Sequence, residues 1–409
     1  MSKTVRLTMA QALSRWLAAQ RVAVDGVETP YFAGIWAIFG HGNVAGMGEA
    51  LAGMEDALPT YRAHNEQGMA HAAIAFAKAS RRRRAMACTT SIGPGATNMV
   101  TAAALAHVNR LPVLFLPGDV YASRRPDPVL QQIEDFADAT VSANDCFRAV
   151  SRYFDRITRP EQIIDALPRA MGVLTDPALC GPVTLALCQD VQAEAYDYPE
   201  SFFAPRLWRQ RRPRADRAEF DRLVEAVRTA KAPLIVAGGG VLYSAAETVL
   251  ANLAAQTGIP VAETQAGKGA LAWDHRQALG SIGVTGTSAA NAAAEAADLV
   301  IGVGTRLQDF TTGSRTLFAG KRLIQINIAA PDAIKQGAEA VVGDARETLE
   351  ALAEALADWQ VEAAWRDANR AAVAEWNAAW DAATAPGTAL PSDAQVIGAV
   401  WRQAGEDAT

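Results

Sequence analysis

Over the first 190 residues, short apolar runs alternate with stretches in which apolar residues recur at helical spacing. The apolar runs predict buried strands over residues 35–39, 84–89, 112–116 and 183–187. The helical spacing predicts a helix that begins at Thr8 and further helices over 66–79, 96–108 and 163–174. Near-continuous apolar strands that alternate with helices are typical of a parallel sheet covered on both faces. The fold class predicted for residues 1–190 is therefore α/β, with a doubly wound parallel sheet.

The pattern breaks at residues 191–217, where prolines, aromatic residues and a basic cluster predict an interdomain linker. A second alternation follows over 218–358, and it predicts a second doubly wound parallel-sheet domain. Its expected strands are at 233–237, 260–263, 298–303, 322–328 and 340–342, and its expected helices are at 244–257 and 345–356. Residues 359–409 are expected to form a connecting helix and, after Ser392, a short helix.

Composition narrows the class of protein. A chain of 409 residues is long enough for two or three domains, and 50% hydrophobic residues allow sizeable cores. The net charge of −6 argues against a nucleic-acid partner. No run approaches the roughly 18 consecutive apolar residues of a membrane span, so no membrane partner is expected. The four cysteines form no CxxC pair, which suits a reducing, cytoplasmic location and predicts no metal ligand.

Two segments carry the strongest candidate chemistry. Glu66 is the lone carboxylate at the start of an alanine-rich helix, where an ordinary acidic residue is also favoured by the helix dipole. Gly93, Pro94 and Gly95 form a turn that leads into a second helix, with Asn98 in its first turn. Such a turn lets backbone approach a ligand closely, although a tight strand-to-helix connection has the same sequence.

Three further side chains are candidates for contact with a substrate. His41 and Asn43 follow the strand predicted at 35–39, and ligands bind at the carboxyl ends of strands in open parallel sheets. The alternative is a glycine turn with a surface histidine. Gln132 follows a stretch rich in arginine, proline and aspartate, and its amide would suit a substrate that bears hydroxyl and carbonyl groups. The alternative is a solvent-exposed loop.

The order of these segments resembles the acetolactate synthase-like superfamily of thiamine diphosphate enzymes. The resemblance is carried by 65–70, 91–98, 231–240, 258–261 and 302–306. It implies thiamine diphosphate and Mg²⁺ as cofactors, a pyrimidine-binding domain followed by a middle domain, and Glu66 as the residue that activates the cofactor. Gly93, Pro94, Gly95 and Asn98 would lie at the cofactor, His41 would be catalytic, and Asn43 and Gln132 would contact substrate.

Three stretches, 24–30, 38–44 and 116–132, resemble more closely the trihydroxycyclohexane-1,2-dione hydrolase family of inositol catabolism. That resemblance implies that a cyclic 1,2-diketone is opened by water to give 5-deoxyglucuronate. It also implies a homo-oligomer, a dimer or tetramer, with each site at a subunit interface.

The superfamily binds diphosphate and Mg²⁺ through a Gly-Asp-Gly motif, which this sequence lacks. We therefore expect a third, diphosphate-binding domain to be missing and the chain alone to be inactive. Two alternatives stay open. The first is an acetolactate synthase-like carboligase with flavin in the middle domain. The second is a non-catalytic, truncated partner of a complete subunit.

Overall fold

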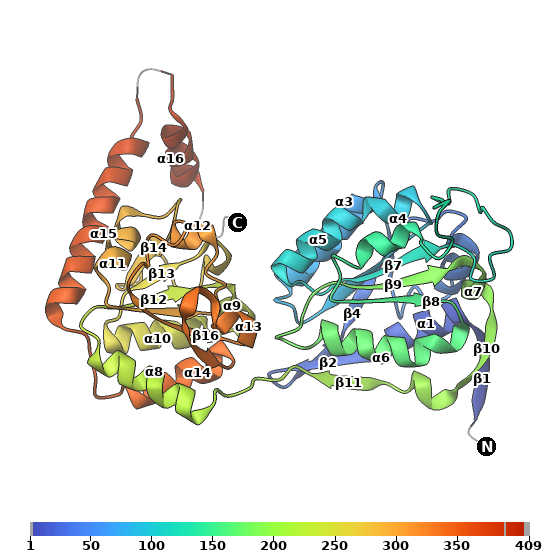
Figure 1. The fold of residues 1–409 in the computed structure, drawn as a ribbon. Coiled ribbons are helices and arrows are strands. Elements are labelled where there is room, and N and C mark those ends of the chain that lie inside the picture. Colours follow the sequence, from blue (N-terminus) through green and yellow to red (C-terminus); the bar gives the residue numbers. More distant parts are fainter. Residues whose placement is uncertain (1–2, 388–389, 405–409) are drawn as a thin grey trace. The chain divides into compact units, whose positions relative to one another are not determined.

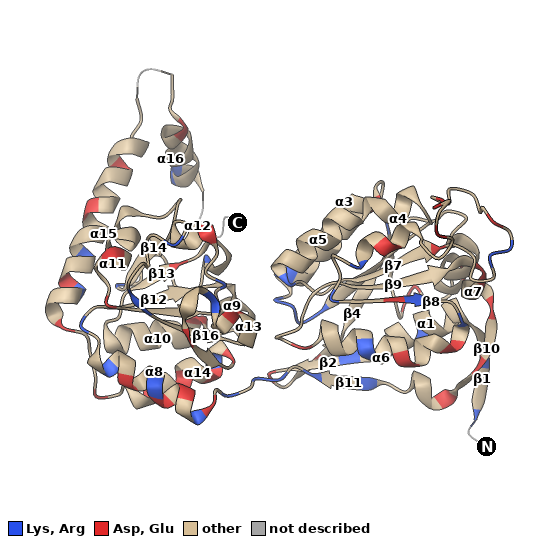
Figure 2. Cartoon of the chain, viewed as in Figure 1, with Lys and Arg blue, Asp and Glu red and all other residues tan. Residues whose placement is uncertain are grey.

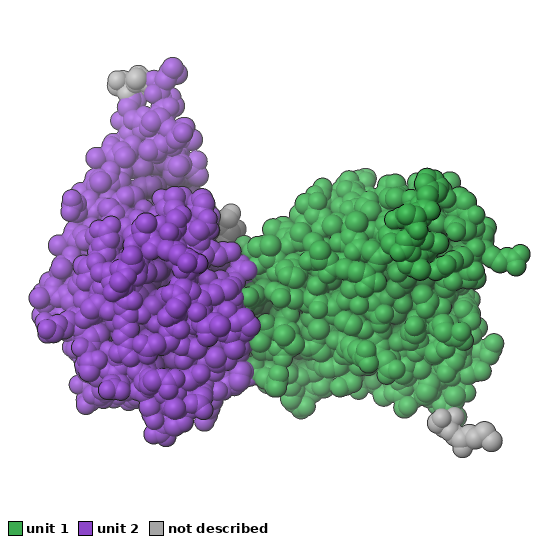
Figure 3. Space-filling model, in the orientation of Figure 1, with its two compact units in different colours: residues 1–211 green, residues 212–409 purple. Residues whose placement is uncertain are grey.

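The computed structural model describes residues 3–387 and 390–404, and the chain divides into two compact units. Unit 1 comprises residues 1–211 and unit 2 comprises residues 212–409 (Figure 3). Each unit is built on its own six-stranded sheet in which all neighbouring strands are parallel (Figure 1). The predicted fold class, two doubly wound parallel-sheet domains, is therefore confirmed.

The sheet of unit 1 has the strand predicted at 84–89 near its middle. In spatial order its strands are β5 (Thr60–Arg62), β4 (Phe32–Ala37), β6 (Ala85–Thr90), β7 (Leu114–Asp119), β9 (Val183–Cys188) and β8 (Tyr153–Ile157). Every residue of β6, β7 and β9 is buried, because helices cover both faces of the sheet. This burial explains why these strands are continuous apolar runs and not alternating ones.

The helices of unit 1 lie in two layers. The α-helices are α1 (Met9–Ala18), α2 (Glu49–Leu51), α3 (Glu66–Ala79), α4 (Pro94–Asn98), α5 (Val100–Asn109), α6 (Ile163–Leu174) and α7 (Gln189–Ala193), with a π-helix η1 (Val44–Gly48) and 3-10 turns η2 (Ala143–Phe147), η3 (Pro160–Gln162) and η4 (Glu200–Phe203). Helices α3, α4 and α5 cover one face of the sheet, and α1 and α6 cover the other (Figure 1). The helices predicted at 66–79 and 163–174 are confirmed with the same bounds.

Two small sheets tie the ends of unit 1 together. Strand β1 (Thr4–Thr8) pairs antiparallel with β10 (Ala195–Pro199). Strand β11 (Arg206–Arg209) pairs with β2 (Gln20–Val24), which in turn pairs with β3 (Val27–Pro30). Residues 195–209 therefore form strands and a turn of unit 1, within the stretch where the sequence predicts an interdomain linker. Their hydrogen-bonding partners lie almost the whole unit away in sequence, so no local pattern reveals them.

Unit 2 repeats the architecture. Its strands, in spatial order, are β14 (Ala278–Ser281), β13 (Val261–Glu263), β12 (Pro233–Ala237), β15 (Leu299–Val303), β16 (Arg322–Asn327) and β17 (Glu339–Val342). Its helices are α8 (Arg217–Thr229), α9 (Gly239–Tyr243), α10 (Glu247–Thr257), α11 (Ser288–Ala296), α12 (Asp309–Thr312), α13 (Ala330–Ala333), α14 (Ala345–Ala355), α15 (Ala363–Thr384) and α16 (Asp393–Gln403), with 3-10 turns η5 (Gln265–Gly267) and η6 (Lys335–Gly337).

The core of unit 2 has two parts, one on each face of its sheet. Helices α8, α10 and α14 pack with Ile235 and Ile301 on one face. Helices α11 and α15 pack with Leu234 and Val300 on the other. Alternate residues of the same strands thus point into different cores, as the period of a strand requires. Across the described ranges 3–387 and 390–404, no helix combines the length and the apolar character that crossing a bilayer demands.

Candidate functional site

The amide of Asn98 holds the carboxylate of Glu66. Asn98 Nδ2, at the end of α4, donates a hydrogen bond of 2.9 Å to Glu66 Oε2, at the start of α3. Helix α3 begins there because the Asn65 side chain caps it, accepting from the Gly68 N–H at 2.9 Å. Glu66 is half-buried, and its partner is an amide and not a cation. The structure thus brings together Glu66 and Asn98, the two predicted cofactor residues that bear polar side chains.

The glycine turn before α4 is packed tightly against this carboxylate. A Cβ on Gly95 would lie 2.9 Å from Thr90 Oγ1 and 3.2 Å from Glu66 Oε1. Only a residue without a side chain leaves both oxygens in place. Pro94 occupies the first position of α4, where its missing N–H costs no hydrogen bond. The turn and the carboxylate therefore form one surface, as a cofactor site at this position requires.

Thr90 is a site residue that the sequence did not single out. It is fully buried at the end of β6, and no hydrogen-bond partner for its Oγ1 is found among the described residues. Buried polar atoms without partners are uncommon in folded proteins. The position of Thr90, one residue before the predicted Ser91–Asn98 turn, was the available signal.

His41 lies in a turn that crosses the carboxyl edge of the sheet. Two glutamines that follow β9 hold this turn: Gln189 Nε2 donates to the His41 carbonyl at 2.8 Å, and Gln192 Nε2 donates to the Gly42 carbonyl at 2.8 Å. The imidazole Nε2 of His41 is buried, and the described part of the chain offers it no partner. The predicted placement of His41 at the strand ends agrees with this turn. Sequence reasoning missed Gln189, whose Oε1 also lacks a partner among described residues.

Asn43 is committed to holding its own turn. Its Oδ1 accepts from the Gly40 N–H at 2.9 Å, and its Nδ2 donates to the Ile38 carbonyl at 3.1 Å and to Thr89 Oγ1 at 3.3 Å. The residue is 2% exposed. Both ends of the amide are thus used inside the chain, in the turn that contains His41. The substrate contact expected of Asn43 stays a prediction.

Gln132 lies in an irregular segment, residues 120–141, between β7 and η2. Its Nε2 donates to Asp127 Oδ1 at 2.7 Å, and its Oε1 accepts from the Val129 N–H at 2.9 Å. The side chain is thus used within the segment, while the segment itself reaches the glycine turn at Gly93. A Cβ on Gly93 would stand 2.0 Å from the Gln131 carbonyl oxygen, and Gly93 has a φ of +66°. Glycine is required at this crossing.

The surface beside the site is poor in charge. Helix α5 contains no Lys, Arg, Asp or Glu, and α3 has only Glu66 and Lys78 at its two ends. Figure 2 shows both helices tan over most of their length. Leu105 and Val108 of α5 are 42% and 52% exposed. Among the residues that the structure describes, no group of three or more His, Cys, Asp or Glu side chains could hold a metal ion.

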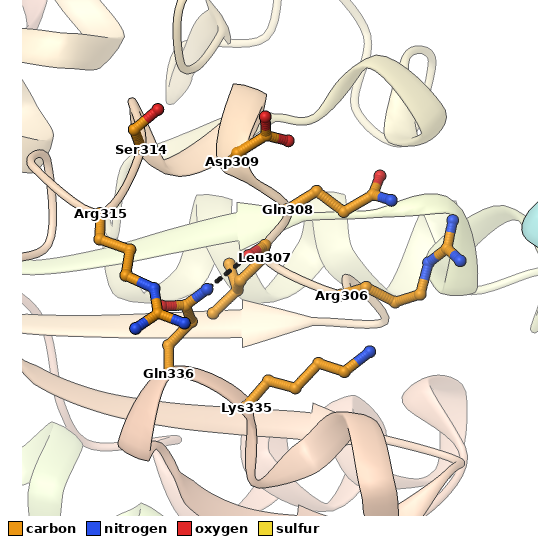
Figure 4. A pocket seen from close by; sticks show the side chains of 8 residues that line it. All are labelled: Arg306, Leu307, Gln308, Asp309, Ser314, Arg315, Lys335 and Gln336. Atoms are coloured by element: carbon orange, nitrogen blue, oxygen red, sulfur yellow. Dashed lines mark hydrogen bonds between the residues drawn. The ribbon is translucent and has the colours of Figure 1, made fainter.

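Unit 2 contains a separate, basic pocket of about 520 Å³. It follows β15 and is lined by Arg306, Leu307, Gln308, Asp309, Ser314, Arg315, Lys335 and Gln336 (Figure 4). Gln336 closes one side by donating to the Leu307 carbonyl at 3.0 Å. Three of the lining side chains are cations and one is an acid; Lys335 pairs with Asp332 at 2.5 Å, so the two arginines are the groups that would favour an anion. The glycine turn at 238–240 is not among the residues that line this pocket. It packs against the backbone at Gly304, because the Gly240 N–H donates to the Gly304 carbonyl at 2.9 Å.

Two protein-family models match the chain. The N-terminal TPP binding domain of thiamine pyrophosphate enzymes matches residues 34–139, and the central domain of thiamine pyrophosphate enzymes matches residues 220–352. The chain belongs to the thiamine pyrophosphate enzymes. The first match contains Glu66, Asn98 and the glycine turn, and the second contains the basic pocket.

Several curated relatives of this thiamine pyrophosphate enzyme carry the name 3D-(3,5/4)-trihydroxycyclohexane-1,2-dione hydrolase. The protein from Geobacillus thermodenitrificans is 54% identical over 87% of this chain and 56% of its own length. Those from Clostridium tetani and Shouchella clausii are each 49% identical, over 91% and 92% of this chain and 58% and 59% of their own lengths. The chain thus spans somewhat more than half of these relatives.

Proposed function

We propose that the protein is a thiamine diphosphate-dependent hydrolase that opens trihydroxycyclohexane-1,2-dione to 5-deoxyglucuronate in inositol catabolism. One observation carries the proposal: the Glu66 carboxylate, oriented by Asn98, lies against the glycine turn at Gly95. The curated relatives named for this substrate, about half identical to the chain, support the choice of a cyclic diketone.

The residues present fit the aminopyrimidine half of thiamine diphosphate. When bound, the cofactor supplies an electron sink for carbon–carbon cleavage. Glu66 would hold a proton at a ring nitrogen through Oε1, since Asn98 occupies Oε2. The absence of a side chain at Gly95 would let a planar ring approach that oxygen. Because no metal ligands are found among the described residues, we assign none on this chain, and Mg²⁺ enters only through the family resemblance.

His41 is the residue we propose for proton transfer with the substrate. An imidazole can donate or accept at either ring nitrogen near neutral pH. The carbonyl of His41 accepts from Gln189, so the backbone of the turn is fixed, while the ring nitrogen Nε2 has no partner among the described residues. Gln132 would contribute by shaping the segment that reaches the Gly93 turn. Asn43 would contribute by holding, through its hydrogen bonds, the turn that contains His41.

We further propose a homo-oligomer with the site at a subunit interface. The uncharged, partly exposed face of α5 and the apolar side chains of the 120–141 segment support this, because exposed apolar surface of this kind is typical of interfaces. Phe136 is 96% exposed. Cytoplasmic location is supported by four free cysteines, three of them buried.

The test is ring opening by the protein expressed from its native gene, with thiamine diphosphate, Mg²⁺ and the cyclic diketone, followed as product formation. Glu66→Gln should lower kcat at least about 100-fold, the range expected when a proton-transfer group is removed. Glu49→Gln is the control, since Glu49 is an exposed acid that also begins a helix of unit 1. No product from the wild-type protein would contradict the proposal, as would full activity of Glu66→Gln. Inactive protein that co-purifies with a longer thiamine enzyme would favour the non-catalytic alternative.

The basic pocket of unit 2 favours one second candidate, a carboligase that holds flavin in its middle domain. Arg306 and Arg315 could pair with the phosphates of such a ligand, whereas Lys335 already pairs with the buried Asp332 carboxylate at 2.5 Å. Purified protein that is yellow and absorbs near roughly 450 nm would support the carboligase, and loss of that colour in Arg315→Gln would locate the flavin in this pocket. Colourless wild-type protein that still opens the diketone would exclude it.

A further inference from the structure

The 120–141 segment is unusually long for a connection without helix or strand. It leaves β7 after Asp119 and returns to regular structure at η2, whose N-cap is Ser142. Loops of this length inside a compact domain are uncommon and are generally either functional or disordered. This one is ordered by hydrogen bonds at both of its ends.

Two side chains join the ends: Asn144 Nδ2 donates to the Gly118 carbonyl at 2.9 Å, and Arg156 bonds to groups at both ends. Arg156 Nε, on β8, donates to Asp119 Oδ2 at 2.8 Å. Arg156 Nη2 donates to Ser142 Oγ at 2.8 Å and lies 3.0 Å from Asp145 Oδ2. The planar guanidinium offers donors in a fixed fork, and here the fork joins the residue before the segment to the residue after it. We name these four residues the clamp.

The clamp is buried enough to fix geometry. The Asp119 side chain is 1% exposed and the Arg156 side chain 18% exposed. A carboxylate so deeply buried requires a partner, and Arg156 supplies the positive charge. The other oxygen of Asp119 accepts from the Val120 N–H at 2.8 Å, so the first peptide of the segment is oriented directly by the same carboxylate.

The middle of the segment reaches the candidate cofactor site. The Gln131 carbonyl lies against Gly93, the residue at which the turn toward Gly95 and Glu66 begins. Inside the segment, Gln132 bonds to both Asp127 and the Val129 N–H, which makes residues 127–132 a compact unit. Between the clamp and this unit, the Ala122 and Ser123 N–H groups donate to the Asp190 carboxylate at 2.9 and 3.1 Å, so the path from the clamp to the Gly93 turn is held by further bonds.

We propose that Arg156 is a positioning residue, which fixes the 120–141 segment by joining Asp119 to Ser142 and so holds the Gln131 carbonyl against the Gly93 turn. The link to cofactor binding rests on the proposed function. The position of the 120–141 segment does not rest on the proposed function, because the contacts that fix the segment lie within unit 1.

The first measurement is amide hydrogen exchange of the ligand-free protein. Arg156→Met should accelerate exchange of residues 120–132 at least tenfold and leave β6 and α3 unchanged. Arg156→Lys keeps the charge without the fork, so it should restore part of the protection. Arg148→Met is the matched control: Arg148 Nε also pairs with Asp145, at 2.7 Å, but it has no role in joining the two ends. That control should exchange like the wild type.

The second measurement is thiamine binding by calorimetry. Arg156→Met should weaken thiamine binding about tenfold, and the affinity of Arg156→Lys should lie between those of Arg156→Met and the wild type. If Arg156→Met fails to fold because Asp119 is left unpaired, Asp119→Asn with Arg156→Met removes both charges and takes its place. Unchanged exchange in residues 120–132 would overturn the proposal, as would faster exchange with unchanged thiamine affinity. If the wild type itself does not bind thiamine, exchange alone decides the role of Arg156, and the proposed function is decided separately by the ring-opening assay.

Discussion

Asn98 and Glu66, 32 positions apart in sequence, meet through a hydrogen bond of 2.9 Å between the ends of two helices. Asn98→Leu removes this donor at similar volume. We expect thiamine affinity to fall about tenfold because the carboxylate loses its orientation, since hydrogen bonds to charged groups contribute about 1.5–3 kcal/mol when buried. The contact is only partly buried, so the free energy of unfolding should change by less than about 1 kcal/mol.

Calorimetry with thiamine and urea unfolding measure the two effects separately. Gln67→Leu is the control, because Gln67 lies in the same turn of α3 and no bond of its side chain enters the site. Wild-type affinity in Asn98→Leu would show that Glu66 needs no orienting amide.

Gly95→Ala tests whether the glycine turn and the carboxylate form one surface. The added Cβ would meet Thr90 Oγ1 at 2.9 Å and Glu66 Oε1 at 3.2 Å, so the carboxylate must move. We expect loss of measurable thiamine binding and a destabilisation of about 1–3 kcal/mol, as for other overpacked sites.

Gly68→Ala is the matched control for this substitution. Its Cβ would find the Asn65 side chain at an ordinary 3.8 Å. Alanine in α3 should stabilise the helix by about 0.5–1 kcal/mol and leave thiamine binding intact. Thermal unfolding should therefore shift in opposite directions in the two variants, and calorimetry should show loss of binding only in Gly95→Ala. Equal thiamine affinity in Gly95→Ala and the wild type would contradict the proposed location of the cofactor.

Local signals accounted for most of the regular elements. Helix α3 was predicted with its observed bounds because Asn65 caps it and its apolar positions repeat at helical spacing. Glu66 and Asn98 were both expected at the cofactor from the family resemblance, but the hydrogen bond between them was not predicted. The parallel sheets followed from strands that are buried on both faces.

Contacts between distant segments could not be predicted in this way. Strand β10 looked like part of a linker because its partner strand, β1, lies far away in the sequence. Thr8, for example, pairs with Ala195. Asn43 was placed correctly at the sheet edge, but its three hydrogen bonds to the chain depend on how the turn folds back. Arg156 carried no motif, and its importance comes only from joining Asp119 to Ser142.

The cysteines give a test of the core of unit 1. Cys146 is exposed, whereas Cys88, Cys180 and Cys188 are buried. Burial raises the pKa of the Cys180 thiol to about 11 and that of the other two further, so their reactive thiolates are scarce at pH 8. We expect one thiol per chain to react with a disulfide reagent within minutes, and all four in denaturant.

Mass spectrometry of the modified peptides would identify the fast site. Cys146→Ser should abolish the rapid reaction without altering the slower reaction of the three buried thiols. Rapid labelling of Cys88 in the folded protein would contradict the position of β6 at the centre of the sheet.

Asp145 should make the stability of the clamp depend on pH. Burial raises the pKa of its carboxyl, but hydrogen bonds from the Ser142 N–H, Arg148 and Arg156 outweigh burial, so the pKa is lowered overall. A lowered carboxyl pKa contributes stability that is present above the unfolded-state value, about 3.9, and is lost as pH falls through the folded-state value. We expect Asp145→Asn to cost about 1–2 kcal/mol at pH 7, where the charged hydrogen bonds are intact.

Urea unfolding at pH 7 and at pH 3 measures this dependence. The difference between Asp145→Asn and the wild type should shrink by at least half at pH 3, because the wild-type carboxyl is then largely protonated in the unfolded chain and folding must displace that proton. Asp138→Asn is the control, since the pKa of Asp138 is also lowered, chiefly by its hydrogen bonds with Thr140, but it lies outside the clamp. In amide hydrogen exchange at pH 7, Asp138→Asn should change the exchange of residues 120–132 less than Asp145→Asn does. If Asp145→Asn destabilised the protein equally at both pH values, the carboxyl would act through its shape and not through its charge. Asp145 would then have no electrostatic role in the clamp.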